Sequence, residues 1–97
     1  MELAKVVGTV VCTQKNVKLD GYKLLIIEAV SVEGTPKKSF AVALDNVGAG
    51  VGEMVLVVKG SSARQAKGME AVPTDSTIVG IVDAVEMEGK VVFKKYA

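Results

Sequence analysis

The residues best suited to chemistry form a short run of small, hydroxyl and basic side chains, Gly60-Ser61-Ser62-Ala63-Arg64. A glycine, two hydroxyls, the start of a helix and an arginine all favour a bound anion. The run does not match a phosphate loop, however, and Arg64 stands where a nucleophile elbow requires its second glycine. We therefore favour a capped turn over an anion site, with Ser61 or Ser62 as the helix N-cap and Arg64 paired with a carboxylate.

A glycine-rich run, Val47-Gly48-Ala49-Gly50-Val51-Gly52-Glu53, invites comparison with the Gly-x-Gly-x-x-Gly fingerprint of dinucleotide-binding proteins. Glu53 takes the place of the third glycine. The run also leads directly into an apolar strand, whereas the fingerprint opens a helix within a βαβ unit. These two differences argue against a nucleotide site. We interpret the glycines as tight turns with positive φ, or as points where two backbones approach closely.

The sequence lacks the side chains of the common catalytic sites. It contains no histidine, which excludes Ser-His-Asp and Cys-His nucleophiles and histidine-ligated zinc. The acids on predicted loops form no carboxylate pair: Asp20, Asp45 and Asp75. Asp83 interrupts an apolar run, so we expect it on a strand face with a structural partner such as Arg64 or a backbone amide. Cys12 fits a small buried strand residue better than a reactive thiol. We predict no enzyme activity, no cofactor and no metal ion.

The composition indicates a single domain, residues 1–97, with more apolar material than one small core needs. Hydrophobic residues make up 49% of the chain, and the mean hydropathy is +0.38. Because a chain of this length buries only about 60 to 70% of its unfolded surface, the surplus predicts self-association. A net charge of +1 provides no broad field for nucleic acid or a membrane surface. The absence of a secretion signal and of a membrane-spanning apolar run favours the cytoplasm.

Runs of valine, isoleucine and leucine, separated by turn residues, predict an all-β fold. The expected strands cover residues 3–13, 21–32, 39–44, 53–59, 77–87 and 91–96. Residues 61–67 have helical character, and Gly68 ends that segment. One short helix between the fourth and fifth strands, followed by a C-terminal hairpin or tail strand, fits a small five-stranded OB-like β-barrel. Residues 21–32 are apolar on both strand faces, which requires cover from a helix layer or another subunit.

Four segments together resemble the EutN/CcmL family in order and spacing along nearly the whole chain. They are Ala4-Lys5-Val6-Val7-Gly8-Thr9-Val10-Val11, Gly48-Ala49-Gly50-Val51-Gly52-Glu53-Met54-Val55-Leu56-Val57, Gly60-Ser61-Ser62-Ala63-Arg64 and Ile78-Val79-Gly80-Ile81-Val82-Asp83. The resemblance implies an OB-like barrel that assembles into a homopentamer at the vertex of a bacterial microcompartment shell, such as a carboxysome. Hexameric shell proteins would be its neighbours, because flat hexagonal layers close only where five-fold corners add curvature.

The resemblance also gives the surplus of apolar residues a use, since each subunit of a cyclic pentamer offers a different surface to each neighbour. By analogy, the following residues are expected near the subunit interface or the five-fold axis: Gly48, Ala49, Gly50, Gly52, Glu53, Gly60, Ser61, Ser62, Arg64 and Asp83. Arg64 is the candidate for an ion pair between subunits, and its candidate partners are Asp45, Asp83 and Glu53.

An alternative from a different class is an OB-type module that binds single-stranded nucleic acid or oligosaccharide. Such modules present stacking aromatic side chains in a basic groove. The aromatic residues of this chain are dispersed along the sequence at Tyr22, Phe40, Phe93 and Tyr96. Their spacing therefore favours the structural shell protein, with no nucleic acid and no membrane among its partners.

Overall fold

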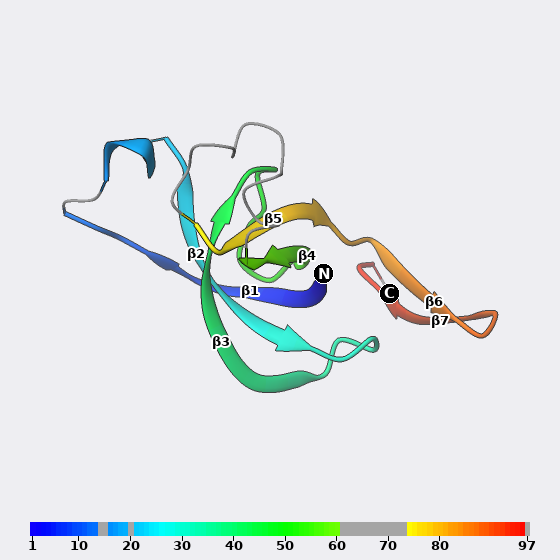
Figure 1. The fold of residues 1–97 in the computed structure, drawn as a ribbon. Helices are drawn as coiled ribbons and strands as arrows, with labels where there is room; N and C mark the ends of the chain where they lie inside the picture. Colours follow the sequence, from blue (N-terminus) through cyan, green and yellow to red (C-terminus); the bar gives the residue numbers. More distant parts are fainter. Residues whose placement is uncertain (14–15, 20, 61–73, 97) are drawn as a thin grey trace.

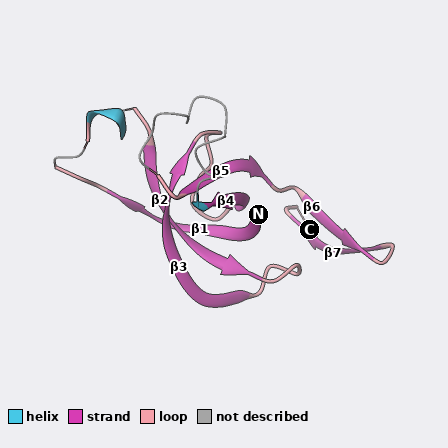
Figure 2. Ribbon diagram, viewed as in Figure 1, coloured by secondary structure: helices cyan, strands magenta, loops and turns pink. Residues whose placement is uncertain are grey.

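The computed structural model describes residues 1–13, 16–19, 21–60 and 74–96 of the chain, and these residues form seven strands and one short 3-10 helix (Figures 1 and 2). The elements are β1 (Glu2–Val10), η1 (Val17–Leu19), β2 (Lys23–Val30), β3 (Pro36–Asp45), β4 (Met54–Lys59), β5 (Ser76–Ile81), β6 (Ala84–Met87) and β7 (Lys90–Lys94). The predicted helix over residues 61–67 lies outside the described residues.

Five of the strands close into a barrel in the order β1-β2-β3-β5-β4, and β6 and β7 form a separate two-stranded sheet. Neighbouring barrel strands are antiparallel except β3 and β5, which run parallel and pair only at Leu44 with Thr77 and Asp45 with Ile78. This confirms the predicted all-β class, the five-stranded barrel and the C-terminal hairpin. Within the described part of the chain, no helix has the length and apolar character needed to cross a bilayer.

Alternation of side chains between the two faces of each strand builds the barrel core. Five members of the core cluster have no exposed surface at all: Val6, Ala49, Val55, Val57 and Ile78. The other buried members are Ala4, Leu25, Ile27 and Ala43. On β2 the outer face is also apolar, because Leu24 and Ile26 alternate with the buried residues and are only half-buried. The expectation of a strand with two apolar faces is therefore confirmed.

The predicted strand over residues 77–87 is wrong in one respect, because it is two strands. β5 ends at Ile81, and the chain bends at Val82 and Asp83 before β6 begins. The Val82 N–H still donates to the Met54 carbonyl on the barrel at 2.8 Å, but the Asp83 carbonyl already accepts from the Lys95 N–H at 2.8 Å. The backbone therefore stops bonding to the barrel after Val82 and starts bonding to the C-terminal segment at Asp83.

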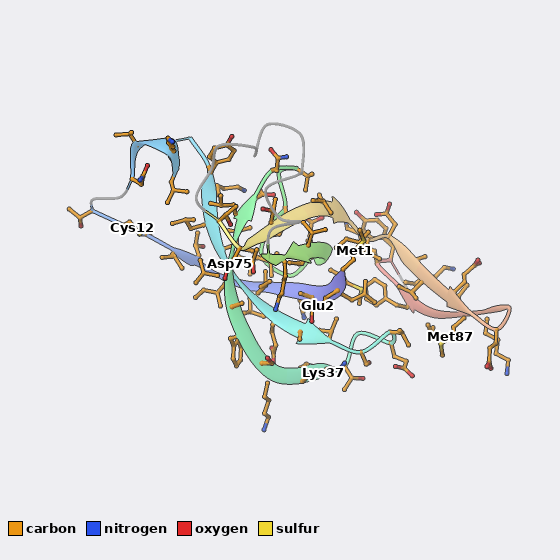
Figure 3. The ribbon with its side chains drawn as sticks, in the orientation of Figure 1. Met1, Glu2, Cys12, Lys37, Asp75 and Met87 are labelled. Carbon is orange, nitrogen blue, oxygen red and sulfur yellow. The ribbon has the colours of Figure 1, made fainter. Side chains whose placement is uncertain are left out.

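Two further predictions are corrected by the ends of the strands. Cys12 is exposed rather than buried, because β1 ends at Val10 and the chain then leaves the barrel (Figure 3). Asp45 is the last residue of β3 and is 6% exposed, where a loop position was expected. Both differences arise at strand ends, where the alternation of apolar residues stops being informative.

The β6–β7 hairpin projects from the barrel, and the longest dimension of the molecule is 44 Å (Figure 1). Phe93 of the hairpin packs next to Gly34 in the β2–β3 turn and Met54 at the start of β4. A Cβ at Gly34 would lie 3.1 Å from the Phe93 ring and 3.2 Å from the Met54 methyl group, and Gly34 has a φ of +90°. Glycine is therefore required here for both its conformation and its size.

Candidate subunit interface

The glycine-rich segment, residues 46–53, joins β3 to β4 and is anchored to the barrel at its centre. Ala49 has no exposed surface and belongs to the barrel core. The Lys23 ammonium, at the start of β2, donates to the Ala49 carbonyl at 2.9 Å. The same ammonium lies 3.7 Å from the Asp45 carboxylate. Lys23 thus ties the first half of the segment to β2 and β3.

The Asp45 carboxylate shapes the entry into this segment. Its Oδ1 atom accepts hydrogen bonds from the Val47 N–H at 3.0 Å and the Gly48 N–H at 3.1 Å. A short aspartate side chain that bonds the backbone two and three residues ahead mimics a turn. Gly48 has a φ of +81°, which glycine adopts without steric cost. Asp45 therefore has a local structural role within its own subunit.

The second half of the segment continues the sheet against β1. The Gly52 N–H donates to the Val6 carbonyl at 2.8 Å, and the Val6 N–H donates to the Glu53 carbonyl at 2.9 Å. The Gly50 N–H donates to Glu53 Oε1 at 2.7 Å. These bonds hold the backbone of the segment in place against β1.

The other carboxylate oxygen of Glu53 connects the segment to the C-terminal hairpin. Glu53 Oε2 lies 2.6 Å from the Lys95 ammonium, and Asp83 Oδ1 lies 3.9 Å from the same nitrogen. The Lys95 ammonium and, to a smaller extent, the Gly50 N–H lower the pKa of Glu53 below its ordinary value. The hydrogen bond to Glu53 raises the pKa of Lys95 in turn. The pair is charged at neutral pH and links barrel to hairpin.

The structure brings some of the predicted interface residues together and separates others. One group of predicted residues lies at the start of β4, near the Lys95 ammonium. It consists of Gly50, Gly52, Glu53 and Asp83. Gly60 lies beyond the other end of β4, a six-residue strand, and therefore about 20 Å away. Its N–H donates to the Asp75 carbonyl at 2.8 Å. The remaining predicted residues lie outside the described part of the chain: Ser61, Ser62 and Arg64.

Asp83 departs from its predicted surroundings, because its side chain is 81% exposed rather than buried on a strand face. The lysines that pair with Asp45 and Glu53 were not among the predicted site residues. Lys95 is 42 residues from Glu53 along the chain, and each lysine has charged or polar neighbours in sequence that mark it as ordinary surface. The pairing follows from the barrel topology, for which the sequence carries no local signal.

Large apolar side chains remain on the surface of the single chain. The valines, aromatic residues and methionines that are more than a third exposed include Val7, Val11, Val17, Phe40, Val42, Val47, Val51, Met87, Val91 and Tyr96. Tyr22 precedes β2 and Phe93 lies on β7, and both are half-buried, whereas Phe40 on β3 and Tyr96 after β7 are exposed. Among the residues that the structure describes, no group of three or more acidic or cysteine side chains is placed to hold a metal ion. The exposed apolar side chains form surfaces suited to association.

Comparison with known proteins identifies relatives along the whole chain. Residues 1–83 match the family described as "Ethanolamine utilisation protein EutN/carboxysome". The bacterial microcompartment shell vertex protein EutN of Salmonella typhimurium is 50% identical over 95 residues, which are 98% of this chain and 96% of that protein.

Solved structures agree with this assignment. The structure of Gloeobacter violaceus CcmL superposes with a TM-score of 0.92 at 38% identity and covers all of both chains. The pentameric microcompartment shell protein GrpN from Rhodospirillum rubrum superposes with a TM-score of 0.80 at 49% identity, covering 90% of this chain and 99% of that one. Sequence and fold therefore lead to one conclusion: the chain belongs to the EutN/CcmL family.

Proposed function

We propose that five copies of this chain assemble into a ring that occupies a vertex of a bacterial microcompartment shell. The observation that carries the proposal is the 49% identity to a pentameric shell protein over 90% of the chain. Relatives named as shell vertex proteins at 50% identity support the same role. The function is structural: the protein closes the shell at its corners, inside the bacterial cytoplasm, and performs no reaction.

The exposed apolar side chains suit such an assembly. A ring with an odd number of subunits cannot be built from two-fold contacts, so each subunit presents two different surfaces to its two neighbours. The half-buried outer face of β2, with Leu24 and Ile26, and the exposed Phe40 and Val42 on β3 provide apolar area for these contacts. Burial of this area between subunits would supply the driving force for association.

We propose that both glycine-containing loops next to β4 contribute to the ring. Gly48, Gly50, Gly52 and Glu53 form the loop at one end of β4, together with Asp83, and Gly60 follows the other end. Ser61, Ser62 and Arg64 come next in the sequence. Because these loops lie about 20 Å apart, they suit an extended contact or two separate contacts, not one compact site. Ala49 would act through the shape of the loop, since its own side chain is buried within the subunit.

Arg64 remains our candidate for an ion pair between subunits. Asp45 and Glu53 already have lysine partners within their own chain. The Asp83 side chain is 81% exposed and lies 3.9 Å from the Lys95 ammonium, which Glu53 holds at 2.6 Å. Asp83 of the next subunit is therefore the preferred partner. Arg64→Ala should leave the barrel folded and weaken the pentamer, because an interfacial carboxylate would lose its partner. Lys18→Ala, on the exposed η1, is the matched control.

Native mass spectrometry at low micromolar concentration tests the ring. We expect a mass of five chains of 10.1 kDa each, and a strict monomer at all concentrations would contradict the proposal. An undiminished pentamer of Arg64→Ala would remove that residue from the interface while leaving the ring intact.

Production together with hexameric shell proteins tests the role at the vertex. Electron microscopy should show closed polyhedral shells when this chain is present and open or tubular assemblies when it is left out. Shells that close equally well without it would contradict the vertex role, even if the isolated protein is a pentamer.

A further inference from the structure

Two charged residues of the described chain have left-handed backbones, and they lie on two separate surfaces. Lys38 in β3 has a φ of 56°, and Glu88 in the turn between β6 and β7 has a φ of 54°. They are the non-glycine residues with positive φ in the part of the chain that the structure describes. Residues with a side chain adopt this conformation at a cost in conformational free energy. Strain held at a surface is a reason to look for a function there.

Lys38 lies in a bulge of β3. Glu28 pairs with Phe40 and Val30 pairs with Pro36, so three residues of β3 lie opposite one residue of β2. The Glu28 carboxylate accepts from the Lys38 N–H at 3.0 Å and holds the bulge open. The β3 bulge surface consists of the exposed residues Lys37, Lys38, Phe40 and Val42. It is basic at one end and apolar at the other.

The β3 bulge surface also has free backbone groups. Within the described residues, β3 has a second strand partner only at Leu44 and Asp45. The edge over residues 36–43 therefore has unpaired N–H and C=O groups facing away from β2. Such an edge is suited to adding a strand from another chain.

Glu88 lies at the tip of the hairpin. Met87 pairs with Lys90, so Glu88 and Gly89 form a two-residue turn with both φ angles positive, which is the type I′ turn. The hairpin tip surface consists of the exposed residues Glu86, Met87, Glu88, Lys90 and Val91. Its two carboxylates outnumber its one ammonium, so its net charge is negative, and Met87 and Val91 make it partly apolar. Figure 3 shows Met87 near this tip and Lys37 on the outer bend of β3, on different parts of the molecule.

We propose that the hairpin tip surface of one subunit docks on the β3 bulge surface of the next subunit in the ring. The proposal rests on the proposed function, because a five-membered ring requires two different surfaces that complement each other. The two surfaces have opposite charge, and each carries two large exposed apolar residues. Among the described residues, neither Lys37 nor Lys38, and neither Glu86 nor Glu88, has an ion-pair partner within its own chain. A second copy of this chain supplies both missing partners.

Charge reversal on each surface, alone and combined, tests the contact. Lys37→Glu and Glu88→Lys should each raise the concentration at which the pentamer dissociates by at least ~3-fold, because every junction of the ring gains a repulsive pair. The variant with both changes should return toward the wild-type value, since opposite charges face each other again. Lys18→Glu, an exposed lysine of η1, controls for the change in net charge. Native mass spectrometry over a dilution series measures the pentamer, and circular dichroism verifies that each variant is folded.

Each outcome bears on the contact. Loss of pentamer in both single variants with recovery in the double variant supports it. Single variants that dissociate like the wild type overturn it, as does a loss that the double variant does not reverse. A wild-type chain that forms no pentamer contradicts the proposed function itself, which distinguishes that failure from the failure of this contact.

Discussion

The barrel and the β6–β7 hairpin are both antiparallel β structure, yet they differ in what holds them. Among the described residues, the barrel encloses six side chains with no exposed surface: Val6, Ala49, Val55, Val57, Thr77 and Ile78. The hairpin contains no residue in the buried class over Ala84–Met87 and Lys90–Lys94. An isolated two-stranded hairpin is at best marginally stable in water. The hairpin therefore depends on contacts outside itself.

Those contacts come from few residues. Phe93 packs against the barrel beside Gly34, and Lys95 forms the ion pair with Glu53. Val85, Val92 and Phe93 are half-buried, and the other residues of the two strands are exposed, including Met87 and Val91. The match to the family described above ends at Asp83, two residues after the last barrel strand ends at Ile81. Burial of side chains stabilises the barrel from within, whereas the hairpin leaves apolar surface that a neighbouring chain can cover.

The largest effect should come from the barrel core. Ile78→Ala should lower the free energy of unfolding by about 2–5 kcal/mol, because it removes buried methyl groups and leaves a cavity. Val91→Ala, the comparable change on the hairpin, should cost within about 0.5 kcal/mol, since Val91 is 50% exposed. Urea denaturation of the dissociated chain measures both. Equal losses in the free energy of unfolding would show that Val91 is packed as tightly as the barrel core.

The next largest effect concerns the turn beneath Phe93. Gly34→Ala should destabilise the chain by about 1–3 kcal/mol, because φ is +90° and the added Cβ would meet the Phe93 ring at 3.1 Å. Gly21→Ala is the matched control, since Gly21 has a φ of +87° and nothing within 4 Å of an added Cβ. Backbone strain is therefore common to both variants.

Hydrogen exchange separates the two causes. In Gly34→Ala the amides of β6 and β7 should exchange faster than in Gly21→Ala, because only the former displaces Phe93. Unchanged hairpin exchange in Gly34→Ala would show that Phe93 does not anchor the hairpin.

The sequence predicts the barrel better than the hairpin for a physical reason. Alternation along Ala4 and Val6, or Val55 and Val57, is a local pattern that one buried face requires. The bend at Asp83 has no such signal, because apolar residues continue on both sides of it. The Lys95–Glu53 pair spans 42 residues, so only the closed topology brings it together. The candidate site was predictable as loops rich in glycine, but not as a set of contacts between barrel and hairpin.

A smaller effect, which depends on pH, should come from the Glu53–Lys95 pair. The pKa of Glu53 is lowered in the folded chain from its ordinary value of 4.5, so the carboxylate stabilises the fold fully above that value. This contribution is lost as the pH falls through the lowered folded pKa. The difference in urea midpoint between the wild type and Glu53→Gln should therefore be constant near neutral pH and shrink below pH 4.5.

The raised pKa of Lys95 acts at the other end of the pH range. Its contribution is complete below the ordinary value of 10.5 and is lost above the raised value. When Lys95→Met is present in both proteins, the acid-dependent difference in urea midpoint caused by Glu53→Gln should become smaller. The ammonium that lowers the pKa of Glu53 most is then gone, and only the Gly50 N–H and the more distant charge of Lys23 still lower it. A difference between wild type and Glu53→Gln that stays constant down to pH 3 would contradict this account of the link between barrel and hairpin.

The smallest change in stability should come from the hairpin tip, and it separates folding from assembly. A type I′ turn favours asparagine where this chain has Glu88. Glu88→Asn should therefore stabilise the hairpin by a few tenths of a kcal/mol, up to about 1 kcal/mol, and slow the hydrogen exchange of the β6 and β7 amides. Glu33→Asn, an exposed acid in the other hairpin turn that lacks a positive φ, should show no such slowing.

If the hairpin tip contacts the next subunit, Glu88→Asn should also weaken the pentamer, although the chain itself becomes more stable. A strained glutamate would then be retained because the ring needs its charge. A Glu88→Asn pentamer that is as stable as the wild type would assign Glu88 to the turn alone.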